Sequence, residues 1–199
     1  MRALPDGRWA AFLMGLALTA LLGLPPAEGA PAFNTLRIAR EGAAPPSDFT
    51  YPDLAGKKTR LSDLKGKVVL LAFFATWCPL CNQEMPKLTR LHEKLKDRGF
   101  TVLAVSVDTA GVGLVKSWTE QKKLTYPILH DQSFASRRTH NVRFVPTLYL
   151  LDRSLNLAAW GVGRVDWEGG KAAALIERLL AAPSPAARRP AGPRTARAP

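Results

Sequence analysis

Two continuous apolar runs stand in the middle of the chain, VVLLAFF at 68–74 and TVLAVSV at 101–107. Runs of this length without polar alternation are typical of strands that are buried on both faces of a sheet. Between them, residues 79–97 have the pattern of a helix that ends near Gly99, because glycine favours the left-handed conformation after a helix. The order strand, helix, strand predicts an α/β arrangement with these two strands in its core.

The rest of the pattern predicts shorter elements. They are a hairpin at 49–60, a helix at 112–122, a short strand at 126–129, a short helix at 134–139, a strand pair at 147–151 and 155–161, and a closing amphipathic helix at 168–181. Ser62 is expected to cap a short turn, and Leu114, Val115 and Trp118 are expected to share one side of the helix at 112–122. We therefore expect a central mixed β-sheet flanked by helices on both faces.

The first 29 residues have the order of an export signal. Arg2 and Arg8 precede an uncharged apolar run from Ala10 to Leu24, which two prolines and the small-residue site at 27–29 follow. The run has 15 residues, whereas a spanning helix needs about 20. Residues 1–29 are thus either a cleaved signal peptide or a retained membrane anchor. In both cases we expect the rest of the chain to be exported, periplasmic or otherwise extracytoplasmic, where thiols meet an oxidising environment.

Composition divides the remainder into three parts. Residues 30–46 are expected to be a linker, 47–182 one domain with its own core, and 183–199, PSPAARRPAGPRTARAP, a disordered basic tail. The net charge is +12 over 199 residues. Lysines and arginines of the central part alternate with acidic residues and form no nucleic-acid motif, so we expect no nucleic-acid partner. Weak attraction to acidic partners or acidic lipid headgroups is more consistent with this charge.

The two cysteines of the chain, Cys78 and Cys81, lie three positions apart in the stretch FFATWCPLCNQEMP. A structural bridge across so short a loop would constrain the unfolded chain little. A zinc site needs about four ligands, and His92, His130 and His140 do not stand at ligand spacing to the cysteines. A copper(I) site with both thiols and His140 stays open, because thiolates suit Cu(I). A redox pair is the remaining interpretation, and the surroundings favour it.

Cys78 is predicted to lie where the strand at 68–74 passes into the following helix. Unpaired backbone N–H groups and the helix dipole favour an anion there, and so lower the pKa of a thiol. Pro79 suits the first helical position because it has no N–H to leave unpaired. Cys81 follows almost one turn later, so its sulfur can reach Cys78 and resolve a mixed disulfide intramolecularly. The pattern predicts Cys78 as the nucleophile and Cys81 as the resolving thiol.

The chain resembles exported thioredoxin-like thiol-disulfide oxidoreductases of the TlpA, ResA and CcmG type. The matching features are Trp77 before the motif, Glu84 and Pro86 three and five positions after Cys81, Val145-Pro146-Thr147 in the place of the cis-proline loop, Asp152, and GRVDW at 163–167. The resemblance covers about residues 46–182. It implies a thioredoxin-like fold with an N-terminal hairpin and a central helix–strand insert at 112–129.

The resemblance also implies how a substrate docks. A cis peptide bond before Pro146 would expose the backbone of Val145 to a docked peptide for strand-like pairing. Trp77 and Pro79 are expected beside the docked substrate. Trp77 and Phe74 are further expected to pack around the sulfurs and to limit access, with a core role for Phe74 as the alternative.

Proton handling near Cys81 is the second implication. Ala72 stands six positions before Cys78, where cytosolic thioredoxin has a buried aspartate. Glu84 lies on nearly the same helix face as Cys81. If desolvated, Glu84 would raise the pKa of Cys81 and could shuttle its proton; otherwise it is a solvated surface carboxylate.

The family's activity is reduction of client protein disulfides, with no cofactor besides the Cys78–Cys81 disulfide itself. Its clients are apocytochrome c thiols in cytochrome c maturation, or the copper-site cysteines of oxidase assembly, and its electrons come from a membrane thiol transporter of the CcdA/DsbD type. Pro79-Leu80 departs from the usual dipeptides, so the direction of electron flow stays open and a disulfide oxidant is an alternative. A Cu(I) chaperone using His140 is another alternative. A peroxiredoxin would have threonine where Ala75 stands.

Overall fold

The computed structural model describes residues 34–40 and 43–183. The expected export segment at 1–29 lies outside these residues, as does nearly all of the expected tail at 183–199. Within the described part of the chain, no helix is long and apolar enough to span a bilayer.

A six-stranded mixed sheet forms the centre of the fold, in the order β1-β8-β7-β4-β5-β6. β4, β5 and β6 are parallel, whereas β1, β7 and β8 pair antiparallel with their neighbours. The strands are β1 (Arg37–Ile38), β4 (Val68–Phe74), β5 (Phe100–Ser106), β6 (Ile128–His130), β7 (Thr147–Leu151) and β8 (Leu157–Val162). Every residue of β4 and β5 is buried, so the two apolar runs are the central strands that the pattern predicted.

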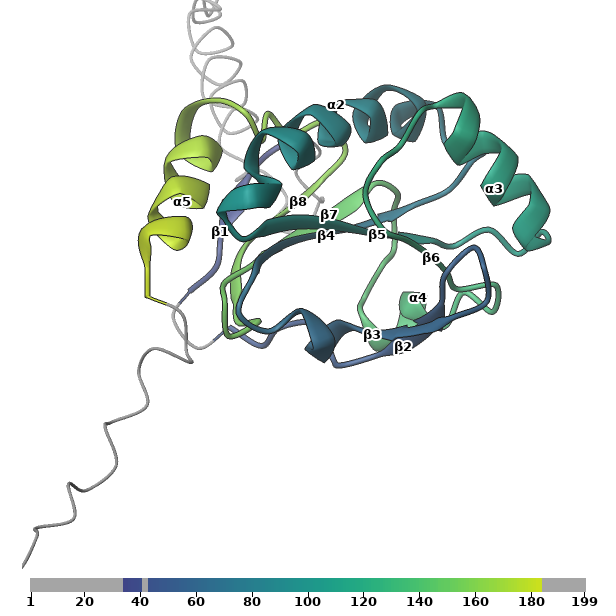
Figure 1. The fold of residues 1–199 in the computed structure, drawn as a ribbon, viewed down its shortest axis with the longest axis horizontal. Coiled ribbons are helices and arrows are strands. Elements are labelled where there is room, and N and C mark those ends of the chain that lie inside the picture. Colours follow the sequence, from purple (N-terminus) through teal and green to yellow (C-terminus); the bar gives the residue numbers. More distant parts are fainter. Residues whose placement is uncertain (1–33, 41–42, 184–199) are drawn as a thin grey trace, which may run out of the picture. The chain divides into compact units, whose positions relative to one another are not determined.

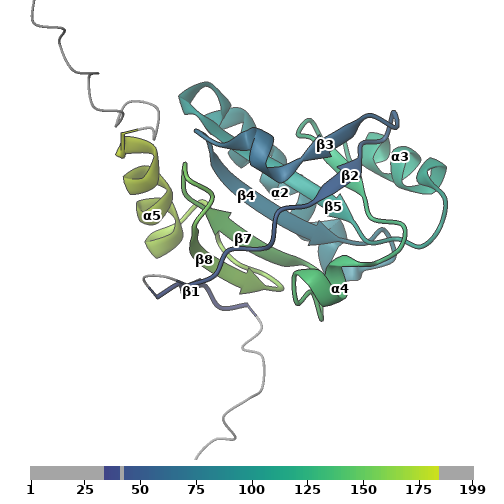
Figure 2. The ribbon, with the colours of Figure 1, turned by 90° about the horizontal axis from the view of Figure 1, so that it is seen from below.

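Helices and a hairpin cover the two faces of this sheet, as expected. The helices are α2 (Pro79–Leu95), which a 3-10 turn η3 (Lys96–Arg98) extends to Gly99, α3 (Val112–Gln121), α4 (Ser136–Thr139) and α5 (Gly170–Ala181). α2 and α3 lie on one face, while α4 and the hairpin of β2 (Thr50–Pro52) and β3 (Lys58–Arg60) lie on the other (Figure 1). Seen from that other face, the hairpin crosses in front of the central strands (Figure 2).

Three local expectations need correction. Ser62 does not cap the turn η2 (Leu61–Leu64), because it lies inside the turn. The cap residue is Arg60, whose backbone N–H donates to the carboxylate of Asp63. Leu114 is exposed, and only Val115 and Trp118 of the expected trio are buried. The expected linker at 30–46 contains β1, which pairs with β8. A two-residue edge strand is held by backbone hydrogen bonds and leaves no hydrophobic period in the sequence.

The strand register brings several connecting segments to one edge of the sheet. Phe74 pairs with Ser106 in the parallel ladder, and Phe73 pairs with Thr147 in the antiparallel one. The end of β6 and the end of β8 lie level with these positions. We call this the carboxyl edge; it comprises the connecting segments 75–78, 107–111 and 131–146 and the first two residues, 163–164, of the segment that joins β8 to α5. Both cysteines follow β4 at this edge.

Candidate active site at the carboxyl edge

Cys78 and Cys81 lie at the start of α2 with free thiols. Cys78 is the N-cap residue, and its Sγ accepts a hydrogen bond from the backbone N–H of Cys81 at 3.2 Å. Pro79 occupies the first helical position, as predicted. Cys78 is 4% exposed and Cys81 is fully buried. The sulfur that a partner can reach is therefore that of Cys78. Its hydrogen bond from the backbone N–H of Cys81 holds it against the first turn of α2.

A cis peptide bond joins Val145 to Pro146 opposite the cysteines, which confirms the predicted cis-proline loop. The thiol of Cys78 donates to the carbonyl oxygen of Val145 at 3.4 Å. The backbone N–H of Gly163 donates to the carbonyl of Pro146 at 2.9 Å and anchors the loop to the end of β8. Pro146 is buried and Val145 is partly exposed. The backbone beside the Cys78 sulfur is thus positioned from two strands.

Asp108 is a buried carboxylate beside this site that the sequence analysis missed. It is 1% exposed and accepts hydrogen bonds from the backbone N–H of Thr76 at 3.0 Å, from the Thr76 hydroxyl at 2.7 Å, and from the Ser106 hydroxyl at 2.7 Å. Two hydroxyls and a backbone amide thus compensate the burial of its charge. The signal for Asp108 was its position just after a buried strand parallel to β4, since carboxyl ends of parallel strands share an edge.

The surroundings keep Cys81 protonated. Burial is the largest cause that raises its pKa, the hydrogen bond with Cys78 is the next, and the negative charges of Cys78 and Asp108 add to it. A buried aspartate is thus present near Cys81 although Ala72 stands at the position noted in the sequence, and it comes from the segment that follows β5. Ala72 itself is fully buried in β4.

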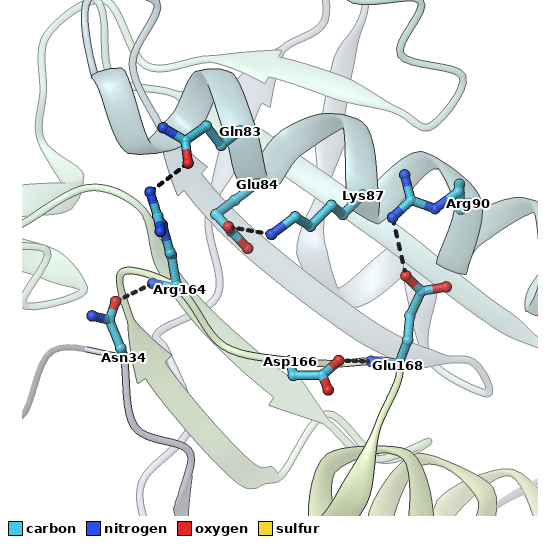
Figure 3. A network of polar contacts seen from close by, with 8 residues as sticks. All are labelled: Asn34, Gln83, Glu84, Lys87, Arg90, Arg164, Asp166 and Glu168. Carbon is cyan, nitrogen blue, oxygen red and sulfur yellow. Dashed lines mark hydrogen bonds and ion pairs between the residues drawn. The ribbon is translucent and has the colours of Figure 1, made fainter.

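Glu84 is buried, and so it is not the solvated carboxylate of the alternative interpretation. Its Oε1 accepts from the ammonium group of Lys87 at 2.7 Å (Figure 3). It is not among the groups that raise the pKa of Cys81, where Asp108 acts instead. The effect expected of Glu84 on the pKa of Cys81 is thus not found, because the side chain turns along the helix toward Lys87, while its part in proton transfer stays a prediction.

The aromatic residues before the motif lie differently from the expectation. Trp77 is 67% exposed and does not pack around the sulfurs. Phe74 is fully buried and stacks on Trp118 of α3 with ring centroids 5.3 Å apart, so its core role holds. Pro79 is exposed beside Trp77. The proposed substrate contacts therefore stand on the surface around a nearly buried sulfur.

His140, the third ligand of a copper site in one alternative, is buried in an aromatic cluster. Its ring stacks on Phe73 with centroids 5.5 Å apart and meets Phe49 edge-on at 5.1 Å. Both ring nitrogens lack a hydrogen-bond partner. In the described part of the chain, no group of three or more histidine, cysteine, aspartate or glutamate side chains is arranged to hold a metal ion. Cys78, Cys81 and His140 thus do not form a ligand set.

Known proteins are similar to this chain in both sequence and fold. Thiol-disulfide oxidoreductase ResA of a Bacillus cereus strain is 38% identical over 106 residues, which cover 53% of this chain and 61% of that protein. The protein of the same name from Geobacillus kaustophilus is 38% identical over 122 residues, covering 61% of this chain and 70% of that one. The match with the first of these relatives thus spans about three fifths of its length.

Solved structures of thiol-disulfide proteins are also similar to this chain. A DsbF homologue from Corynebacterium diphtheriae has a TM-score of 0.63 at 26% identity and covers 77% of this chain and 94% of its own. A thiol:disulfide interchange protein of the thioredoxin family from Chlorobium tepidum TLS has a TM-score of 0.59 at 27% identity, with 71% and 98% covered. The sequence profile of the AhpC/TSA family matches residues 42–159. The chain therefore belongs to the AhpC/TSA family and has a thioredoxin-like fold.

Proposed function

We propose that the chain is a thiol-disulfide oxidoreductase in which Cys78 is the nucleophile and Cys81 the resolving thiol. The observation that carries this proposal is the placement of the Cys78 sulfur. It lies 3.2 Å from the backbone nitrogen of Cys81 and 3.4 Å from the carbonyl oxygen of Val145, next to cis Pro146. A docked peptide that pairs with the Val145 backbone would bring its own sulfur to Cys78.

The exchange proceeds in two steps that balance. The Cys78 thiolate attacks one sulfur of a client disulfide, forming a mixed disulfide and releasing the other client sulfur, which takes up a proton. The Cys81 thiolate then attacks the Cys78 sulfur, forming the Cys78–Cys81 disulfide and releasing the second client sulfur. Two electrons and two protons thus pass from the protein dithiol to the client. Holding Cys81 next to Cys78 makes the second step intramolecular.

Cys81 must lose its proton for the second step. Burial raises its pKa, so the reduced protein keeps Cys81 as a thiol while Cys78 reacts. Asp108 is the carboxylate whose charge acts on Cys81, whereas Glu84 pairs with Lys87, and we therefore propose Asp108 as the group that accepts this proton. In this scheme Asp108 acts on the reacting atoms through Cys81.

We assign the chain to reduction of client disulfides outside the cytoplasm. Resemblance to the TlpA, ResA and CcmG type supports this direction, with apocytochrome c or copper-site proteins as clients and a membrane thiol transporter of the CcdA/DsbD type as the electron donor. The apolar run at 10–24 supports export, as a cleaved signal or a retained anchor. A reductant in an oxidising compartment needs such a continuing supply of electrons.

The reduction potential of the Cys78–Cys81 couple tests the direction. It is measured by equilibrating the protein with defined thiol/disulfide buffers and quantifying the free thiols by alkylation. A potential near about −270 mV supports a reductant, and one near about −120 mV assigns the protein as an oxidant instead. Failure to form a Cys78–Cys81 disulfide in any oxidising buffer would remove the proposed function altogether.

A further inference from the structure

The carboxyl edge carries the exposed groups that a docked partner meets first. The nucleophile Cys78 and the Val145 backbone lie within it, because the end of β4 and the start of β7 are level. Asp108 and Thr76 join the segment after β5 to the segment after β4. The Gly163–Pro146 hydrogen bond joins the end of β8 to the same place. The side chains of these segments therefore form the surroundings of the reactive sulfur.

Large apolar side chains gather on these segments and on the helix turn that follows one of them. Trp77 directly precedes Cys78 and is 67% exposed, and Phe144 directly precedes Val145 and is 43% exposed. Val112 and Leu114, in the first turn of α3, are 43% and 52% exposed. Trp77 and Phe144 directly precede the two residues of the Cys78–Val145 contact, so a partner that docks there would meet both side chains. The charge that a partner should carry is then inferred from the charged side chains of the carboxyl edge.

Those charges have one sign. The exposed charged side chains of the carboxyl edge are four arginines, Arg137, Arg138, Arg143 and Arg164. Asp108 and Asp131 are the acidic residues of these segments, and each is 1% exposed and turned inward to hydrogen-bond donors. Asp166 and Glu168, which are both exposed, follow in the same connecting segment as Arg164, and Glu168 pairs with Arg90 (Figure 3). The exposed charge of the carboxyl edge itself is therefore positive, while the carboxylates of Asp108 and Asp131 are turned inward.

Two of the four arginines donate hydrogen bonds to neutral side chains. Arg143 donates to the side-chain oxygen of Asn141 at 3.0 Å. Arg164 donates to the side-chain oxygen of Gln83 in α2, as Figure 3 shows. Among the described residues, the ion pairs within 4 Å do not include any of the four arginines. By contrast, Arg98 at the far end of α2 pairs with Glu177 at 2.6 Å. The charge at the carboxyl edge is available to a partner.

Resting on the proposed function, we propose that the client disulfide that reacts with Cys78 is flanked by carboxylates. Such a client segment would lie along the Val145 backbone with its acidic side chains toward Arg143 and Arg164, and with an apolar side chain against Trp77 or Phe144. Charges at the rim of a docking site act mainly on the association rate, and they do so less at high salt. The specificity of the site is then for acidic client segments over basic ones.

The test uses three synthetic peptides of equal length, each with one internal disulfide and flanking residues that are all Glu, all Gln or all Lys. The rate at which each peptide oxidises the reduced full chain is followed by stopped-flow tryptophan fluorescence, at about 20 mM and about 500 mM salt. Each rate is divided by the rate at which dithiothreitol reduces the same peptide, which removes differences in intrinsic disulfide reactivity. At low salt we expect the Glu peptide to react on the order of tenfold faster than the Lys peptide, and the advantage to shrink at high salt.

A matched pair of variants locates the effect. Arg143→Gln/Arg164→Gln should remove most of the advantage of the Glu peptide, expressed as its rate relative to that of the Gln peptide with the same variant. Lys94→Gln/Arg178→Gln removes the same net charge from exposed positions in the last turn of α2 and in α5, and it should retain the advantage. Lys94 lies about 24 Å along the helix from Cys78, at about 1.5 Å per residue.

The outcomes separate this inference from the function on which it rests. If the Gln peptide does not oxidise the protein, the proposed function fails. If the Gln peptide reacts but the three peptides react equally, or the Lys peptide reacts fastest, the inference is wrong and the function stands. Equal loss of the advantage in both double variants would show a net-charge effect and would also overturn the inference.

Discussion

The carboxylate of Asp108 accepts hydrogen bonds from both the backbone N–H and the hydroxyl of Thr76, two residues before Cys78. This contact ties the segment that delivers Cys78 to the strand next to β4. It also places a buried negative charge where it raises the pKa of Cys81. One side chain thereby helps to position the first cysteine and adds to the effect of burial on the pKa of the second.

Replacing Asp108 with Asn should change both the pKa of Cys81 and the stability of the fold. The pKa of Cys81 should fall, because the charge is lost, and stability should fall by about 1–3 kcal/mol, because a buried donor loses its acceptor. Thiolate absorbance at 240 nm in a Cys78→Ser background measures the pKa, and urea unfolding measures the stability. Thr76→Val is the control: it should lower stability with little change in the Cys81 pKa. A Cys81 pKa unchanged by Asp108→Asn would contradict the assigned role.

The two thiols should differ strongly toward alkylating reagents. In the reduced protein at pH 7.5, iodoacetamide should modify Cys78 first, because Cys81 is fully buried and its pKa is raised. We expect the Cys78→Ser variant to be alkylated more slowly than the Cys81→Ser variant by about tenfold or more. Peptide mapping by mass spectrometry reports the order. Faster labelling of Cys81 would reverse the assignment of nucleophile and resolving thiol.

His140 should make the fold sensitive to acid. Burial lowers its pKa from 6.5, against a smaller opposing effect of Asp131, so the unfolded chain binds the proton at a higher pH than the folded chain. The stabilising contribution is complete above about pH 6.5 and is lost as the pH falls below it. His140→Phe loses no side-chain hydrogen bond and should reduce this loss. The pKa of His92 is also lowered by burial. His92 should therefore leave part of the pH dependence of stability in the variant.

The measurement for His140 is the free energy of unfolding at pH 5 and pH 7.5 in both proteins. Between pH 7.5 and pH 5 the variant should lose less free energy of unfolding than the unaltered protein. Tyr149 donates to the backbone oxygen of His140 at 2.8 Å, a contact that the substitution keeps. Equal pH dependence in both proteins would exclude His140 as a source of acid sensitivity.

The Glu84–Lys87 pair should show coupling in a double-mutant cycle. Glu84 is buried while the Lys87 side chain is 49% exposed, so Lys87→Met leaves a buried carboxylate without its partner. We expect Lys87→Met to cost about 1 kcal/mol in the presence of Glu84 and less in a Glu84→Gln background. Chemical denaturation of the four proteins gives the coupling. Additive effects would indicate that the pair is incidental.

Much of the fold could be predicted from local pattern, because the central strands are buried on both faces and leave continuous apolar runs. The start of α2 was likewise readable from Cys78 and Pro79, whose roles at a helix N-terminus depend on neighbouring residues alone. Asp108 was missed, since its position after a buried strand indicates the edge of the sheet but not its contact with Thr76, which arises from strand register and spans 32 positions. Glu84 lay on the predicted helix face, but the competition between Cys81 and Lys87 for its carboxylate depends on side-chain direction.

The exposure of Trp77 was also beyond the sequence. An aromatic residue next to a buried strand is ordinarily expected to be covered, and Phe74 at the end of β4 obeys this rule. Trp77 follows three residues later, after the chain has left the sheet, and nothing in the described part of the fold packs over it enough to bury it. Its exposure became interpretable only together with Phe144 and the arginines of the carboxyl edge.

The most direct test is to trap the covalent intermediate. The reduced Cys81→Ser variant is mixed with a peptide disulfide, quenched with acid and analysed by peptide mapping with mass spectrometry. Because this variant lacks the resolving thiol, the mixed disulfide should accumulate at Cys78 in close to one equivalent, and Cys78→Ser should form none under the same conditions. Absence of an adduct at Cys78, or equal adduct formation at Cys81 in the Cys78→Ser variant, would contradict a nucleophilic Cys78 and the exchange mechanism built on it.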